Sequence, residues 1–431
     1  MNAPAKTYLS FSFCMALLGI MMSEQSCTTY VPMDSGSYRY LYDFESSYLH
    51  PDFIVFHTAE DSSTLYFKIN TAELLYIRKD PSSPFTAKVH VAWMLQNFSG
   101  SSLIVTDSSS FDLVDQADAP SQKWLVGNEV IAMPPTDNQS LEVTVTDVNK
   151  QVVSVTRISV SKASKASRQN FLFVNASTNE PLFNQVAAPG MYVSIFSPRN
   201  NMNDVRIFHS TEELRLPPPP FSSNAPEFPD LQSCSAIAPE HKGTGVMTFE
   251  AGSGLYFVTS DISRTMGSTV MVCDPHYPEI KDVAQLTWPI RYISSKTEFE
   301  EIQKNNYPKK LIDNFWMDCG GSRERARDLI RIYYNRVREA NYYFTSFTEG
   351  WRTDRGMIHL VFGNPTKINR FGDSETWIYG EEGNVASLQF LFRKMDSPIT
   401  GNLYVLNRDP TFKAHWERAV TAWRNGKVYN E

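Results

Sequence analysis

The chain has 431 residues, of which 42% are hydrophobic, 13% aromatic and 20% charged. This apolar content excludes a wholly disordered chain, and the length allows about two to three domains with ordinary cores. Because the net charge is −7, a dedicated nucleic-acid binder is disfavoured and no nucleic-acid partner is expected.

The first 26 residues, 1–26, are predicted to form an export signal. Lys6 precedes an uncharged, mostly apolar stretch over residues 8–22, which is too short to span a bilayer comfortably as a helix. The small residue before Cys27 then resembles a bacterial lipoprotein cleavage site, of the looser kind found in Bacteroidota. The resemblance implies acylation of Cys27 and a tether over residues 27–37, because two or three acyl chains anchor a protein firmly. The alternative is ordinary signal-peptide cleavage, with Cys27 as an incidental thiol.

The residues after Cys27 bear on the location of the protein. Residues 28–32 contain no acidic cluster of the kind that often follows the cysteine in surface-exported lipoproteins. We therefore expect a lipid-anchored outer-membrane protein that faces the periplasm rather than the cell surface. No later uncharged apolar run reaches the roughly 18 residues of a membrane span.

Two β-rich domains are predicted to follow the tether. Over residues 38–161, short alternating runs separated by turn residues indicate an antiparallel β-sandwich. Examples of these runs are residues 52–57, 64–69, 87–93 and 141–146. Residues 162–168 are small, polar and basic, and are predicted as a linker. A second β-rich domain is expected over residues 169–281.

A polyproline segment interrupts the second β-rich domain. Leu216 is followed by four prolines and then by Phe221. Four consecutive prolines enforce a polyproline II rod without backbone donors. We predict a rigid strap across the surface of the sandwich, and a recognition motif is the alternative.

The cysteines and histidines give little support for metal chemistry. An oxidising envelope permits a disulfide between Cys234 and Cys273, closing a loop of about 40 residues, whereas the alternative leaves these two and Cys319 as buried thiols. The eight histidines are scattered, and the sequence has neither Cys-x-x-Cys nor His-Glu-x-x-His. We expect no metal site and no cofactor.

The C-terminal domain, residues 282–431, is predicted to be α+β. The clearest helix covers residues 323–344, where apolar residues recur at three- and four-residue steps. A last helix is expected over residues 410–424. The predicted strands are residues 357–362, 376–379, 387–392 and 402–406. The fold class is therefore mixed, with all-β, sandwich-like domains followed by an α+β domain.

One motif of this domain identifies a family. Residues 349–356 read Glu-Gly-Trp-Arg-Thr-Asp-Arg-Gly and precede an apolar run that ends at Phe362. The motif resembles the GWxTD domain of bacterial envelope proteins, common in Bacteroidota, and the similarity extends upstream through residues 334–344 to Trp288. It implies an envelope protein whose last ~150 residues have the family fold, and it implies no particular reaction.

The motif residues have a structural and a functional interpretation. Those expected to act in structure or in binding are Gly350, Trp351, Thr353, Asp354, Arg355 and Gly356. In the structural interpretation, Trp351 fills the seam between helix and sheet, Asp354 holds a turn, and Gly356 leads into a strand. In the functional interpretation, Trp351 is a stacking platform beside the polar contacts of a groove. A catalytic version pairs Asp354 with Glu349.

The most consistent function is that of a non-catalytic accessory or scaffold subunit in an envelope assembly, secretion or transport complex. The lipid anchor would hold it at the outer membrane, where outer-membrane proteins or lipoproteins would bind the sheet edges and exposed aromatics of its β domains. The alternative is an envelope glycan-binding protein or hydrolase that uses a groove around Trp351, Asp354 and Arg355.

Overall fold

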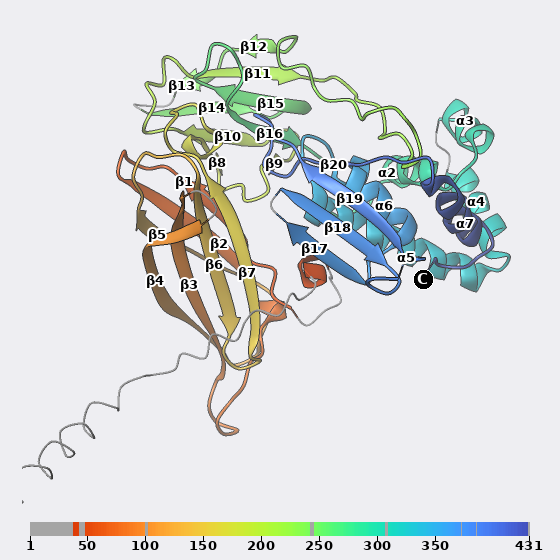
Figure 1. Cartoon of the computed structure of the whole chain (residues 1–431), viewed down its shortest axis with the longest axis horizontal. Coiled ribbons are helices and arrows are strands. Elements are labelled where there is room, and N and C mark those ends of the chain that lie inside the picture. Colours follow the sequence, from red (N-terminus) through yellow and green to blue (C-terminus); the bar gives the residue numbers. More distant parts are fainter. Residues whose placement is uncertain are drawn as a thin grey trace, which may run out of the picture. The chain divides into compact units, whose positions relative to one another are not determined.

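A computed structural model describes the chain over residues 38–42, 48–99, 102–241, 245–306, 309–371, 373–384 and 386–429. The predicted export signal, Cys27 and the tether lie outside these residues. The predicted fold class is confirmed, because sheets fill the N-terminal part and helices join strands in the C-terminal part (Figure 1). None of the helices in the described part combines the length and apolar content that a membrane span requires.

The first β region consists of two antiparallel sheets. One has the strand order β1-β2-β5, with β1 (Asp52–Phe56), β2 (Ser62–Asn70) and β5 (Trp124–Ala132). The other has the order β4-β3-β6-β7, with β3 (Phe85–Ser99), β4 (Ser102–Ala117), β6 (Gln139–Asp147) and β7 (Val152–Val160). Every second residue of β6 from Leu141 to Val145 is buried in the core between the sheets. This alternation is the signal from which the sandwich was predicted.

The segment predicted as a linker, residues 162–168, connects β7 to the second β region and carries a buried lysine. The ammonium of Lys162 donates to the carbonyls of Ser62 and Met133, at 2.8 and 2.7 Å. The carbonyl of Lys162 in turn accepts from Arg199 at 3.0 Å. Because a buried ammonium is costly without such partners, these bonds fix the connection in place.

The second β region also has two sheets. The first has the order β13-β14-β10-β8, with β8 (Leu172–Asn175), β10 (Tyr192–Phe196), β13 (Glu240–His241) and β14 (Val246–Glu250). The second has the order β12-β11-β15-β16-β9, with β9 (Val186–Ala187), β11 (Arg206–Ser210), β12 (Ser235–Ile237), β15 (Gly254–Thr259) and β16 (Ser268–Val272). β15 is buried on both faces: Val258 faces the core between these sheets, whereas Phe257 packs in a cluster with Ile399 of the C-terminal domain.

The disulfide that the sequence permits between Cys234 and Cys273 is not formed. Both thiols are free and buried, as is Cys319. Cys234 directly precedes β12 and Cys273 directly follows β16, and two strands, β11 and β15, lie between them. Three strand spacings amount to about 14 Å, whereas a disulfide allows about 7 Å at most between its Cα atoms. The alternative of three buried thiols therefore describes the structure.

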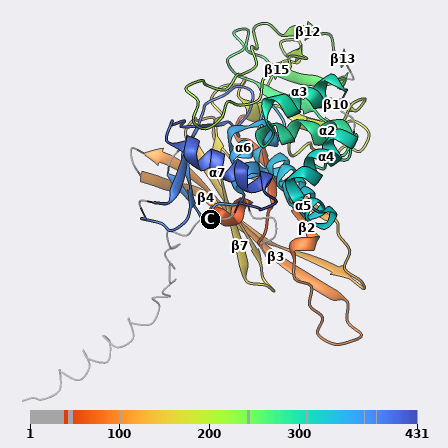
Figure 2. The same ribbon diagram turned by 90° about the vertical axis from the view of Figure 1, so that its right-hand side faces the viewer.

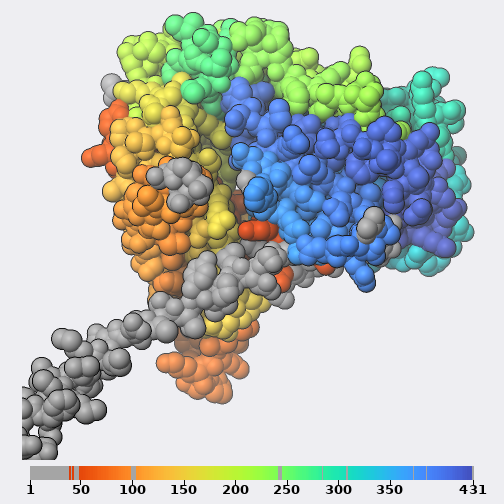
Figure 3. Space-filling view, in the orientation of Figure 1, coloured from red at the N-terminus to blue at the C-terminus, as the bar shows by residue number. Residues whose placement is uncertain are grey.

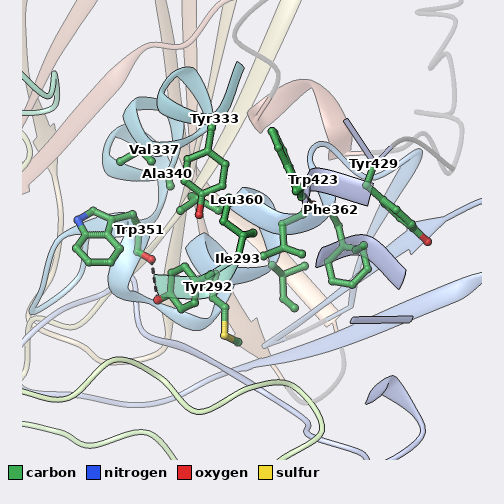
Figure 4. Packing of buried hydrophobic residues seen from close by; sticks show 14 of the residues in the cluster. Tyr292, Ile293, Tyr333, Val337, Ala340, Trp351, Leu360, Phe362, Trp423 and Tyr429 are labelled. Carbon is green, nitrogen blue, oxygen red and sulfur yellow. Dashed lines mark hydrogen bonds between the residues drawn. The ribbon is translucent and has the colours of Figure 1, made fainter. Parts of the chain in front are cut away.

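The C-terminal domain packs helices against a four-stranded antiparallel sheet (Figure 2). The sheet has the order β17-β18-β19-β20, with β17 (Lys367–Phe371), β18 (Ser374–Tyr379), β19 (Leu388–Lys394) and β20 (Tyr404–Leu406). The helices are α2 (Val283–Thr287), α3 (Lys296–Lys304), α4 (Lys309–Gly320), α5 (Arg323–Phe344), α6 (Asp354–Phe362) and α7 (Phe412–Arg424), with 3₁₀ turns η4 (Trp288–Tyr292) and η5 (Gly350–Arg352). The predicted helix over residues 323–344 is confirmed as α5. Aromatic side chains of several elements, among them Tyr333 and Trp423, fill the core (Figure 4).

The predicted strand over residues 357–362 is wrong, because these residues belong to α6. Gly356 therefore lies in the first turn of a helix and does not lead into a strand. All nine residues of α6 are buried, so its apolar residues do not alternate with polar ones. Without such a period, the sequence does not distinguish a strand from a helix. The N-cap was the available signal: the Thr353 hydroxyl accepts the backbone N–H of Gly356, and Asp354 follows in the first turn.

Candidate functional site

The GWxTD motif joins α5 to α6 at a point where two glycines are required. A Cβ atom on Gly350 would lie 1.8 Å from the carbonyl oxygen of Ala340 in α5. A Cβ atom on Gly356 would lie 1.9 Å from the carbonyl oxygen of Gly350. The turn η5 therefore packs directly on the backbone of α5, and α6 packs directly on η5.

Trp351 is turned into the core. It is 3% exposed, and its indole N–H donates to Glu349 at 3.1 Å. Its carbonyl oxygen accepts the hydroxyl of Tyr292 at 3.2 Å, and the two rings meet edge to face (Figure 4). In this position the ring face has protein neighbours, as in the structural interpretation of the motif.

Asp354 forms a buried ion pair. It is 4% exposed, and Arg408 donates to both of its carboxylate oxygens. The backbone N–H of Leu406 adds a bond of 2.8 Å. Burial raises the pKa of Asp354, and the bonds and charge of Arg408 oppose this shift. The carboxylate therefore ties α6 to the end of β20.

Arg355 is buried in a second polar cluster. Its guanidinium donates to the carbonyl and side-chain oxygens of Asn402, and it lies over the ring of Tyr404 at 3.9 Å. It also lies 3.6 Å from Glu375. Although burial opposes the shift, Arg370 and Arg355 lower the pKa of Glu375. No sequence motif pointed to Asn402 or Glu375, because each is a single polar residue without a diagnostic neighbour.

A third buried polar group joins α5 to α6. His359 accepts or donates a bond of 2.9 Å with Glu339, and both side chains lie in the core. Arg336, one turn earlier, donates to the carbonyls of Leu360 and Val361. Burial lowers the pKa of Arg336 to about 10. This group was not predicted from the sequence, because its members lie on two helices and only one of these helices was predicted.

The polyproline segment is a strap, but it crosses the C-terminal domain rather than the sandwich. In Figure 3 the segment around residues 210–230, in lime green, lies over the blue C-terminal domain. Its backbone oxygens accept bonds from the motif region: Leu214 from Arg352 at 2.6 Å, and Pro218 from Arg408 at 3.0 Å. A polyproline II rod leaves its carbonyls free, and arginines of the domain use them.

Two hollows lie along the strap. One, beneath it, is lined by Arg352, Asp354 and Arg355 and holds about 30 Å³, which suits one or two water molecules. Trp351 is not among its lining residues. The other is an open groove of about 690 Å³ between the prolines and α7, with Trp416 on its wall.

The proposed catalytic carboxylates have separate partners. Glu349 accepts the indole N–H of Trp351, and burial raises its pKa. Asp354, which follows η5 in the sequence, is bound by Arg408. Among the described residues, no group of three or more histidine, cysteine, aspartate or glutamate side chains is arranged to hold a metal ion.

Comparison with known families gives one match. The family model described as the GWxTD domain matches residues 254–425, a range that begins at β15 and includes the whole motif. The match thus starts inside the segment predicted as the second β-rich domain. No curated protein matches the chain.

Proposed function

We propose that this chain, which belongs to the family of proteins with a GWxTD domain, is a non-catalytic accessory or scaffold subunit of an envelope assembly, secretion or transport complex. In this proposal it is a lipoprotein of the Bacteroidota type, held in the outer membrane by an acylated Cys27 and facing the periplasm. The observation that carries the proposal is that the polar motif side chains are used inside the domain. Asp354 binds Arg408, and Arg355 binds Asn402.

The same contacts disfavour a hydrolase or a glycan-binding groove at the motif. A general acid or base must reach its substrate, but both oxygens of Asp354 have protein partners and the strap lies above them. A sugar-stacking tryptophan needs an open ring face, but Trp351 is 3% exposed. Such a function would require the strap and Arg408 to leave the motif.

The first sandwich offers a surface for partner proteins. β4 is an edge strand of 16 residues and contains none of the lysine, arginine or proline residues that usually protect an edge. Leu103, Val105 and Val114 on this strand are each about half exposed. A strand of a partner could extend the sheet here, because the outer backbone groups of an edge strand template such pairing.

Fatty-acid labelling tests whether Cys27 is acylated and anchors the protein. Cells fed an alkyne-tagged fatty acid should label the wild-type chain and retain it in the membrane fraction, whereas Cys27→Ser should remove both the label and the retention. Cys14→Ser, a change within the predicted export signal, is the matched control and should preserve both. A wild-type chain that carries no label would overturn the anchor.

A mild-detergent pull-down from native membranes, with a tag after Glu431, tests the scaffold. The wild-type chain should retain a stoichiometric outer-membrane protein or lipoprotein. The double variant Asp354→Leu/Arg408→Met removes the ion pair but keeps apolar packing, so it should fold and still retain the partner. A partnerless wild-type monomer that binds glycans, and a folded double variant that has lost this binding, would instead establish the groove function.

A further inference from the structure

The first described residues, 38–42, pack against the C-terminal domain, more than 300 residues later in the sequence. η1 (Tyr38–Tyr42) packs on β17, and Figure 1 shows it as the short red helix beside that blue strand. Tyr42 is 7% exposed and belongs to the core of the GWxTD domain. Its ring meets Phe344 and Tyr343 edge to face, at centroid distances of 5.0 and 5.5 Å.

The pocket around Tyr42 is specific for a phenol. The hydroxyl of Tyr42 donates to Glu375 at 2.7 Å, and it accepts from Arg355 at 3.2 Å and from Arg370. Glu375 is itself held by Arg370 at 2.7 Å and by the indole of Trp377 at 3.2 Å. We call this set the tyrosine socket: Arg355, Arg370 and Glu375, with the rings of Tyr343, Phe344 and Trp377. A phenylalanine would fill the space but leave buried polar groups short of a partner.

η1 depends on the socket for its structure. It has five residues, and so short a helix has no stability of its own in water. Tyr38 makes a further contact with the socket, because the Arg370 guanidinium lies 5.5 Å from its ring centre. The socket residues lie within the family match at 254–425, whereas η1 lies outside it. The domain thus holds η1 as a binding site holds a peptide.

We propose that residues 38–42 are a separable peptide ligand of the GWxTD domain, and that the tyrosine socket fixes the start of the mature chain to this domain. One consequence rests on the proposed function. Eleven residue steps separate Cys27 from Tyr38, and they can reach about 40 Å at most. With Cys27 acylated, the tyrosine socket is therefore held within about 40 Å of the membrane surface.

A nicked chain tests the socket without depending on the anchor. In a Cys27→Ser chain, residues 43–47 are replaced by a protease site, and the N-terminal fragment carries a fluorophore. After cleavage the fragment should stay bound, and an unlabelled peptide of residues 28–45 should displace it. Half-maximal displacement should require about a tenfold higher concentration of the Tyr42→Phe peptide than of the wild-type peptide. For the Tyr42→Ala peptide the concentration should be at least about 100-fold higher. The Tyr30→Ala peptide is the matched control and should act as the wild type does.

The Tyr42 substitutions are made in the competitor peptide, and the cleaved protein that binds it (the receiving chain) keeps the wild-type socket. A folding defect caused by a Tyr42 substitution therefore does not affect this measurement. Arg370→Ala in the receiving chain should weaken retention of the fragment, since it removes a partner of both Tyr42 and Glu375. The proposal is overturned if the fragment leaves on cleavage without competitor, or if the Tyr42→Ala peptide displaces it as well as the wild-type peptide.

Membrane proximity is tested separately in the acylated chain. A fluorophore on Phe371→Cys, next to Arg370 and 88% exposed in the wild type, should be quenched by energy transfer to acceptor-labelled phosphatidylethanolamine in vesicles. A fluorophore on Ile262→Cys, at a position 99% exposed between β15 and β16, should be quenched less. Equal quenching would overturn the membrane-proximal placement but not the socket, and an unacylated chain would overturn the anchor alone.

Discussion

The first sandwich and the GWxTD domain differ in how deeply their ion pairs are buried. In the sandwich, ion pairs lie at the surface: Asp112 on β4 pairs with Lys88 and His90, and all three side chains are close to half exposed. The GWxTD domain has exposed pairs as well, such as Lys309–Asp313, but its Asp354–Arg408 and Arg355–Glu375 pairs are almost completely buried in the core. The two regions therefore differ in their ion pairs: the GWxTD domain has pairs of opposite charges within its core, whereas the pair on β3 and β4 of the sandwich is in contact with water.

This difference sets how each region should respond to substitution. An exposed pair contributes little, because water competes for both charges. A buried pair adds little net stability either, but removal of one partner leaves the other charge without compensation in the core. Loss of one charge should therefore be severe at the buried pairs of the GWxTD domain and almost silent at exposed pairs, whether in the sandwich or on a helix of the domain.

Asp354→Ala should have the largest effect. It leaves Arg408 buried without its carboxylate and should lower the free energy of unfolding by about 4 kcal/mol. Chemical denaturation of the full chain measures this. Asp313→Ala, which breaks the exposed Lys309–Asp313 pair on α4, is the control and should cost less than about 1 kcal/mol. Equal losses in the two variants would contradict the comparison.

Gly350→Ala should come next, at about 3 kcal/mol, because the added methyl group would collide with the backbone of α5. Chemical denaturation again measures the change in the free energy of unfolding. The matched substitution is Gly252→Ala, where a Cβ atom would meet only the hydroxyl of Tyr256, at 3.4 Å. If Gly350→Ala is as stable as Gly252→Ala, then η5 does not pack on α5 as described.

One of the buried titratable groups of the sandwich should have a comparable effect. His57 is fully buried against Ser63 and Ser161, and burial lowers its pKa to about 4. The unfolded chain protonates this histidine near pH 6.5, so it binds more protons than the folded chain between pH 6.5 and 4. Stability should be greatest above pH 6.5 and should fall by about 2–3 kcal/mol as the pH drops to 4. His57→Asn should remove this part of the pH dependence, and His90→Asn should retain it.

The sequence predicted the sandwich and the long helix well, because both follow from local periodicity. Alternation in β6 and the three- and four-residue steps of α5 are visible within about ten residues. The sequence did not predict α6 as a helix, because a segment buried on all sides carries no period. It did not exclude the disulfide, because strand order separates Cys234 from Cys273 and strand order is not a local property.

The candidate site was predicted in part for the same reason. The motif residues were found, because they are adjacent in sequence. Their partners Arg408 and Glu375 were not found, because each lies tens of residues away in an ordinary strand or loop. Tyr42 is separated from Glu375 by 333 residues, so only the folded chain brings them together. The polyproline rod was predicted, but not the surface it covers, since its arginine partners have no signature of their own.

The smallest expected effect on stability comes from Val114→Lys on β4. Val114 is 58% exposed, so the substitution should change the free energy of unfolding by less than about 0.5 kcal/mol. A lysine nevertheless protects an edge strand against pairing, so capture of the partner in the membrane pull-down should fall sharply. Ile262→Lys, at an even more exposed apolar position outside the first sandwich, should keep the partner. If Val114→Lys still retains the partner, then this edge is not the binding surface, and the partner would be expected to bind the GWxTD domain.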